Sequence, residues 1–255
     1  MINISSEFLQ HWVIMLLWPL TRILGMIAVA PIFSHTGIPN RIRLGLGIVL
    51  TIMLIPTLPP LPQFDAFSFQ GLMILAQQMI IGLSIGFSMR LVFAAVELSG
   101  YLISMTMGLG FATFFDPLSR GQTSAISQFL VMLALLVFLS LDGHLMFITV
   151  LAQSFITMPI ALTSHIDYMQ IAIWGEIVFS AGLLLALPVL TTLLITNMAL
   201  GILTRTAPQL NLFGIGFPIT ICIGFLILTL SLAPMVQPIV NLIETGHNHM
   251  LETIQ

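Results

Sequence analysis

The sequence predicts an all-α, polytopic membrane protein. Of its 255 residues, 58% are hydrophobic and 6% are charged, and the mean hydropathy is +1.12. A soluble domain carries about 25% charged residues, so this chain has too few to keep a folded surface in water. High hydrophobicity with low charge also excludes intrinsic disorder. The apolar runs do not alternate with polar residues, and lipid admits helices or closed barrels, so we expect helices rather than strands.

Six apolar runs organise the chain. A helix needs about 20 apolar residues to cross the hydrocarbon layer of a bilayer, and four of the six runs clearly exceed that length. Of the others, one is short and one is broken near Asp142, while the longest run of all can bend at Pro188. The links are too short and stiff to separate domains, so we expect one helical domain over residues 1–255. The runs are residues 12–33, 44–58, 72–96, 126–151, 171–200 and 212–236.

The few charged residues limit the functions open to the chain. All six basic residues are Arg, and the net charge of −3 leaves no basic surface for a nucleic acid. Cys222 lies in an apolar run and is expected to be an inert apolar side chain rather than a reactive thiol. Arg22 and Arg90 interrupt apolar runs at a cost of about 2.5–3.5 kcal/mol each in a membrane, so they should face protein or water. Together with Glu97, they are the candidate buried charges.

Small residues recur at helical spacing in and after the third run. Gly82 and Gly86 form a G-x-x-x-G pattern, which is typical of two closely packed helices. Further along, one narrow face of the predicted helix is small or polar and the next face is apolar. This narrow face suits a helix that lines an aqueous path, and equally a helix that packs closely through its small residues. Its residues are Glu97, Gly100, Tyr101, Ser104 and Gly108.

An apolar loop with three Phe residues follows this helix. Gly108 and Gly110 free its backbone at one end, and Asp116 with the Pro after it fixes the other end. Phe and Met side chains make deformable apolar seals, so we interpret the loop as a gate that projects into a conduit and blocks it. An interfacial aromatic anchor and plain core packing are the alternatives. The predicted gate comprises Met105, Met107, Gly108, Leu109, Gly110, Phe111, Thr113, Phe114, Phe115 and Asp116.

No motif for catalysis or cofactor binding occurs in the sequence. H-E-x-x-H, G-x-S-x-G and the phosphate-binding G-x-x-x-x-G-K-[ST] are all absent, and the lack of Lys excludes Schiff-base chemistry. We therefore expect neither an enzyme nor a bound metal or cofactor. His247 and His249 lie in a polar tail and are weak candidates for metal binding. A small-solute transporter is the alternative function, although polar residues beside the helix-breaking Pro19 and Pro188 are sparse.

Four stretches of the sequence resemble the FliR family of the flagellar type III export gate. They are MGLGFATFFDP at residues 107–117, TNMALGILTRTAPQLNLF at 196–213, IPNRIRL at 38–44 and DGHL at 142–145. They span most of the chain, keep the family's order and are highly specific when taken together. The second stretch contains the family's loop motif, with Arg205, Pro208, Gln209 and Asn211.

The resemblance implies kinked helical hairpins packed into a multi-subunit export gate, with the loop from Gly108 to Asp116 as a plug in the channel. The implied partners are FliP-like and FliQ-like gate subunits, FlhB-like and FlhA-like components, and the unfolded flagellar subunits that pass through. The implied location is the bacterial inner membrane at the flagellar basal body, with much of the gate above the bilayer plane on the periplasmic side. The resemblance implies no catalysed reaction, in agreement with the absence of catalytic motifs.

Overall fold

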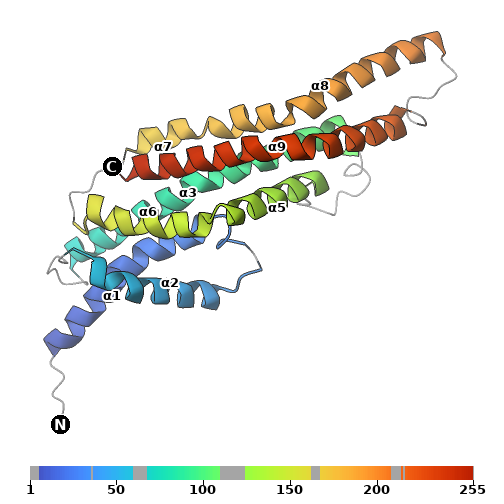
Figure 1. Ribbon diagram of the computed structural model, residues 1–255. Coiled ribbons are helices and arrows are strands. Elements are labelled where there is room, and N and C mark those ends of the chain that lie inside the picture. The colour runs from blue at the N-terminus through green and yellow to red at the C-terminus, as the bar shows by residue number, and fades with distance from the viewer. Residues whose placement is uncertain are drawn as a thin grey trace. The chain divides into compact units, whose positions relative to one another are not determined.

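The computed structural model describes residues 6–35, 37–59, 68–109, 124–161, 167–207, 214 and 216–254, with side chains from residue 15 onward. No strand occurs in these ranges, which confirms the predicted all-α class. The helices follow the predicted apolar runs in order (Figure 1). They are α1 (Ser6–Val29), α2 (Asn40–Leu54), the short 3-10 helix η1 (Ile55–Thr57), α3 (Phe69–Thr106), α5 (Ala125–Ser140), α6 (Gly143–Thr157), α7 (Tyr168–Trp174), α8 (Ile177–Thr206) and α9 (Phe217–Thr253).

Several of these helices are long and apolar enough to cross a membrane. In the described part of the chain there are four, and the bent pair α5–α6 counts as a fifth if it forms one broken span. The four are Asn40–Thr57, Phe69–Thr106, Tyr168–Thr206 and Phe217–Thr253. The apolar part of α1 with described side chains, Met15–Val29, is shorter. A span over the first apolar run, residues 12–33, therefore stays a prediction, while the polytopic membrane class is confirmed.

Helix α3 continues past the third apolar run to Thr106, close to the helix end predicted near Gly108. Helix α9 runs further than predicted and continues through Thr253. The expectation of a polar tail after the last run was therefore wrong, because those residues are helical. Polar residues support this part of α9: Gln237 donates its side-chain amide to Asn241 at 2.9 Å, one turn further on. Such pairs at a spacing of four residues stabilise a helix.

The run at 126–151 breaks near Asp142, as predicted. Helix α5 ends at Ser140 and α6 begins at Gly143. Between them, Asp142 adopts a left-handed backbone conformation with φ 54°, which Asp tolerates better than most residues. Its carbonyl then accepts a hydrogen bond from the N–H of Leu145 at 2.8 Å, so the new helix starts at the break.

The chain divides into two compact units. The first comprises Met1–Leu91, Asp142–Gly175 and Glu244–Gln255, and the second comprises Val92–Leu141 and Glu176–Ile243. Helices α3 and α9 contribute residues to both units. The expectation of one domain over the whole chain stays a prediction.

In the first unit, glycines bring α1 and α3 together along their backbones. A side chain at Gly82 would overlap the carbonyl of Arg22, and a Cβ at Gly86 would lie 2.7 Å from the carbonyl oxygen of Met26. From the other side, a Cβ at Gly25 of α1 would lie 2.7 Å from the carbonyl oxygen of Met79 in α3. Helix α2 lies beside α1 (Figure 1). The buried core of this unit includes Trp18, Ile23, Ile27, Ile74, Ile81, Phe147 and Phe155.

In the second unit, the same kind of contact joins α3 to α5 and to α8. Gly100 of α3 lies directly against the backbone of Ser127 in α5. Gly182 of α8 lies against α3, where a Cβ would sit 2.9 Å from the carbonyl oxygen of Ala95. Small residues therefore set the helix spacing in both units, as expected where apolar surroundings give little drive for helix association. The buried core of the second unit includes Phe93, Leu130, Phe138, Leu185, Val189 and Leu193.

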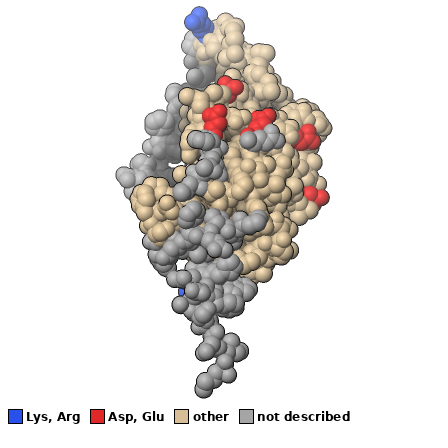
Figure 2. Space-filling view, turned by 90° about the vertical axis from the view of Figure 1, so that its left-hand side faces the viewer, with Lys and Arg blue, Asp and Glu red and all other residues tan. Residues whose placement is uncertain are grey.

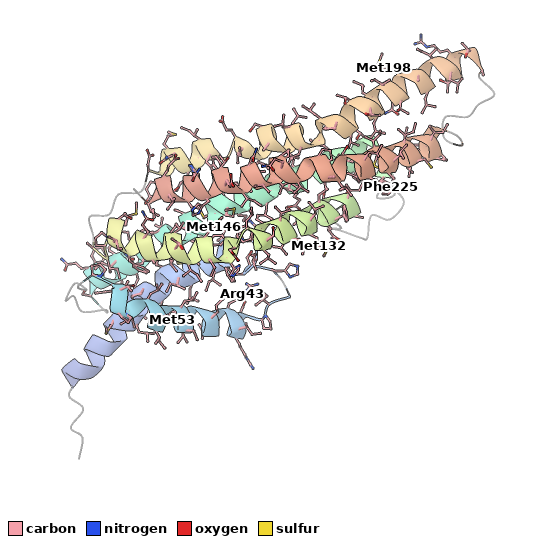
Figure 3. All side chains as sticks on the ribbon, in the orientation of Figure 1. Arg43, Met53, Met132, Met146, Met198 and Phe225 are labelled. Atoms are coloured by element: carbon pink, nitrogen blue, oxygen red, sulfur yellow. The ribbon has the colours of Figure 1, made fainter. Side chains whose placement is uncertain are left out.

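Many large apolar side chains of the described residues are exposed. Figure 2 shows a face on which acidic residues are scattered among uncharged ones. In Figure 3, labelled side chains project from four helices: Met53 from α2, Met132 from α5, Met198 from α8 and Phe225 from α9. These side chains are 68%, 65%, 63% and 48% exposed. Apolar surface on this scale is typical of a protein that is covered by lipid or by other proteins.

We expect Gly82→Ala to destabilise the first unit by about 1–3 kcal/mol, because the added methyl group would overlap the Arg22 carbonyl and push α1 away from α3. Gly45→Ala is the matched control. A side chain there meets nothing within 4 Å, and Ala favours a helix over Gly by about 1 kcal/mol. Thermal unfolding of the purified protein in detergent measures both variants. Equal stability of the two would contradict this account of the packing.

Candidate functional site

The predicted gate begins inside the described residues and continues outside them. Met105, Met107, Gly108 and Leu109 lie at the C-terminal end of α3, in the second unit. The structure therefore shows the base from which the loop starts. The remaining gate residues lie outside the described part of the chain: Gly110, Phe111, Thr113, Phe114, Phe115 and Asp116.

Met107 fixes the end of α3 to α9. Its side chain is fully buried. Its Cγ, Sδ and Cε atoms lie 2.6, 2.9 and 2.7 Å from the position that a Cβ at Gly224 would take, so Met107 fills the space that this glycine leaves. One turn earlier on α9, Thr220 donates its hydroxyl to the Met107 carbonyl at 3.5 Å and to the Phe217 carbonyl at 3.0 Å. The last turn of α3 is thus held by both packing and hydrogen bonding.

Gly108 turns the chain out of α3. Its φ of 83° lies in the left-handed region, which glycine adopts without the steric cost that other residues meet. A Cβ at this position would also lie 2.7 Å from the Phe217 ring. Its N–H donates to the carbonyl of Met105 at 3.0 Å. One glycine and one aromatic ring therefore set the direction in which the loop leaves the helix.

A cavity of about 350 Å³ lies beside this turn, between α3, α8 and α9. Its lining includes Met105, Gly108, Asn197, Gly201, Thr204 and Phe217. The family's loop motif follows along the chain, and its first residue, Arg205, is exposed at the end of α8. The rest of that motif, Pro208, Gln209 and Asn211, lies outside the described residues. Phe217, Thr220 and Gly224 were not predicted as part of this site, because they lie in an otherwise uniform apolar run.

The small and polar face of α3 packs at some positions and stays open at others. Gly100 and Ser104 are buried, and Gly100 packs against α5 at Ser127. Close helix packing therefore explains these two positions. Glu97 and Tyr101 are exposed, so packing within this chain does not account for them. The aqueous path stays a prediction for that part of the face.

Arg22 is completely buried in the first unit. Its Nε donates to Oε1 of Gln78 at 2.8 Å. Its Nη1 donates to the carbonyl and hydroxyl oxygens of Ser154 at 2.7 and 3.1 Å, and its Nη2 donates to the carbonyl of Met158 at 2.8 Å. The guanidinium also lies over the Phe155 ring, 4.3 Å from its centroid. These contacts join α1 to α3 and α6.

The partners of Arg22 lie at the C-terminal end of α6. Ser154 belongs to its last turn and Met158 follows directly after it. Carbonyls at the end of a helix lack partners within the helix and carry the negative end of its dipole. Among the described residues, no hydrogen-bond partner of Arg22 is acidic, so backbone and amide dipoles stabilise this charge. The signal for Gln78 in the sequence was a pair of adjacent amides, Gln77 and Gln78, inside an apolar run.

Arg90 and Glu97 are exposed in this chain, so the expectation that they are buried charges was wrong for the chain by itself. Their spacing of seven residues places both on one face of α3. Neither side chain forms a hydrogen bond or an ion pair with a described residue.

His247 and His249 belong to α9, and His249 takes part in a packed cluster of the first unit. Its ring stacks on Trp174 of α7 with 4.3 Å between centroids, and its Nδ1 lies 3.5 Å from Oε2 of Glu252. Trp174 in turn donates to the carbonyl of Ser88 at 3.0 Å. Within the described ranges, no group of three His, Cys, Asp or Glu side chains is placed to bind a metal ion.

Comparison with known proteins narrows the class that the fold defines, a polytopic helical membrane protein. The family model described as "Bacterial export proteins, family 1" matches residues 13–246. The flagellar biosynthetic protein FliR of Pectobacterium carotovorum subsp. carotovorum is 44% identical over 240 residues, covering 93% of this chain and 91% of that protein. FliR of Escherichia coli (strain K12) is 41% identical over 241 residues, with the same coverage of 93% and 91%. FliR of Bacillus subtilis (strain 168) is 30% identical over 240 residues, with coverage of 89% and 91%.

These matches define the class as bacterial export proteins. The chain belongs to the FliR family of flagellar biosynthetic proteins. It is thus a membrane component of the flagellar export apparatus. The resemblance that the four sequence stretches indicated is confirmed over almost the whole chain.

We expect Arg22→Met to destabilise the protein by about 2–4 kcal/mol, because the buried oxygens of Gln78 and Met158 would lose their donor. Arg41→Met is the matched control, because Arg41 is exposed on α2 and surface substitutions usually change stability by less than about 0.5 kcal/mol. Thermal unfolding in detergent, followed by Trp fluorescence, compares the two variants. If both unfold at the same temperature, the Arg22 network does not stabilise the first unit.

We expect Gly224→Leu to displace Met107 from its slot, because the new side chain would occupy the same space. Oxidation by dilute peroxide, read by mass spectrometry, reports this: Met107 should react faster in the variant, while the exposed Met105 serves as the internal reference. Gly201→Leu is the matched control, since a side chain there meets nothing within 4 Å. Unchanged protection of Met107 in Gly224→Leu would refute the packing of Met107 against Gly224 as the contact that holds the end of α3.

Proposed function

We propose that this chain is a structural and gating subunit of the flagellar type III protein-export channel, in which residues 108–116 plug the conduit for unfolded substrates. Membership of the FliR family supports the export role. The observation that carries the gating part is the packing at the base of the loop. The Met107 side chain fills the space at Gly224, and Gly108 turns the chain beside the Phe217 ring.

A plug of this kind needs a deformable tip and a fixed root. Three Phe side chains supply an apolar tip that excludes water and ions by dewetting, and they deform when a chain passes. Met107 supplies the root, since its side chain packs at Gly224 of α9 and its carbonyl accepts the hydroxyl of Thr220 of α9. Gly108 and Gly110 provide the backbone freedom between root and tip. A loop built in this way returns to the same closed position after each substrate.

The proposal also covers the assembly and its location. The chain acts as one domain over residues 1–255, without catalysing a reaction, together with FliP-like and FliQ-like subunits and with FlhB-like and FlhA-like components. It lies in the bacterial inner membrane at the flagellar basal body, with part of the gate on the periplasmic side. The exposure of several helices supports such neighbours. In the 18-residue apolar stretch of each span, 22% of the residues are buried for α2 and 28% for the spans that contain α8 and α9, against 61% for α3.

The small-solute transporter that the sequence left open has less support. The relatives that cover about nine tenths of this chain are flagellar biosynthetic proteins by name. Uptake assays on the purified chain in liposomes separate the two functions, because an export subunit moves no solute by itself.

We expect the double variant Phe114→Ala with Phe115→Ala to raise the passive ion leak across the inner membrane several-fold, because a smaller tip no longer excludes water from the conduit. Phe179→Ala is the matched control, since Phe179 is an exposed Phe on α8. The leak is measured as the decay rate of membrane potential in cells that carry each variant with the other export components. An unchanged leak at equal protein level would rule out the seal.

A further inference from the structure

The exposed face of α3 in the second unit carries a carboxylate without a counter-charge. Glu97 is exposed. It lies on α3, a helix of 38 residues that is long and apolar enough to cross a membrane. Its side chain forms no hydrogen bond or ion pair within the described residues. Its backbone carbonyl accepts the hydroxyl of Ser127 at 3.0 Å, which ties this turn of α3 to α5.

Glu97 lies at a hollow of about 260 Å³ between α3 and the start of α5. The walls are Ala94, Leu98 and Tyr101 from α3 with Ser124 and Ser127 from α5. The backbone contact between Gly100 and Ser127 keeps the two helices at a fixed distance. A cavity of about 150 Å³ accommodates a benzene molecule, so this hollow is large enough for one long side chain.

We propose that the hollow receives an Arg or Lys side chain from a helix of another subunit of the export apparatus, whose charged end pairs with Glu97. This inference rests on the proposed role of the chain as a subunit of that apparatus. Charge complementarity selects the occupant, because lipid tails offer Glu97 no counter-charge and desolvated carboxylates require a partner. Long basic side chains combine an apolar stem with a charged end, and the stem lies along Leu98 and the half-exposed Tyr101 ring.

A metal ion fits this hollow poorly. Calcium takes six to eight oxygen ligands and magnesium demands an octahedral set. The hollow offers one carboxylate together with the oxygens of Tyr101, Ser124 and Ser127. The hydroxyl hydrogen of Ser127 is already given to the Glu97 carbonyl. A basic side chain needs one carboxylate and is therefore the better match.

Site-specific photocrosslinking tests the proposal in the assembled apparatus. The residue at Tyr101 is replaced by p-benzoylphenylalanine in a strain that lacks its own copy of the chain, and the crosslinked peptide is identified by mass spectrometry. The expected adduct is a helical peptide of another membrane subunit, with Arg or Lys within one turn of the crosslinked residue. An adduct with lipid, with a second copy of this chain or with a peptide that lacks a basic residue overturns the proposal.

A second test exchanges the charges of the proposed ion pair. Glu97→Arg and the near-isosteric Glu97→Gln should each lower the crosslink yield more than about tenfold at equal protein level. Changing the identified basic residue to Glu should restore the yield with Glu97→Arg. Glu244→Gln is the matched control, because Glu244 is an exposed carboxylate of α9 and should leave the yield unchanged.

The two levels of the proposal fail in different ways. If the unaltered chain does not restore motility to the deletion strain, the proposed function fails. If it restores motility while Glu97→Gln crosslinks as well as the unaltered chain does, the cation site fails and the proposed function stands.

Discussion

The structure depends on how helices associate where apolar side chains gain little by touching each other. In such surroundings, contact has to come from close van der Waals packing and from hydrogen bonds. Both units of this chain use glycine for the first of these. Gly82 and Gly86 bring α3 against the backbone of α1, and Gly100 and Gly182 join α3 to α5 and α8. At each of these close contacts a glycine lies on α3 or on the helix packed against it.

Arg22 shows how hydrogen bonds add what packing by itself does not give. Apolar helix surfaces can pack in several alignments. The planar guanidinium of Arg22 can donate to Gln78, Ser154 and Met158 at the same time in only one of them. Its charge is stabilised by the carbonyl end of α6, so no acidic residue has to enter the core. A residue that looks costly in an apolar run thus fixes how α1, α3 and α6 meet.

The sequence predicted the helical class, the order of the spans and the break at Asp142, because these follow from composition and from local backbone chemistry. It did not predict the length of α9, because polar residues near His247 have the composition of a tail although they pack in a helix. The partners of Arg22 and the slot at Gly224 were also missed. Those contacts join residues far apart in the chain, and no periodic pattern within one run encodes them.

The exposed surface contains apolar side chains that lipid can cover and polar groups that it cannot satisfy. Exposed Leu, Ile and Met side chains on α8 are compatible with lipid, so they do not require a partner. Asn197 and Glu97 are exposed as well, and a polar amide or a carboxylate against lipid is costly. Gly201 is exposed with open space around it, although Ala would favour the helix more. Asn197 and Gly201 line the cavity beside Gly108, and Glu97 lies in the same unit. Lipid satisfies these positions poorly, so contact with water or with other subunits stabilises them.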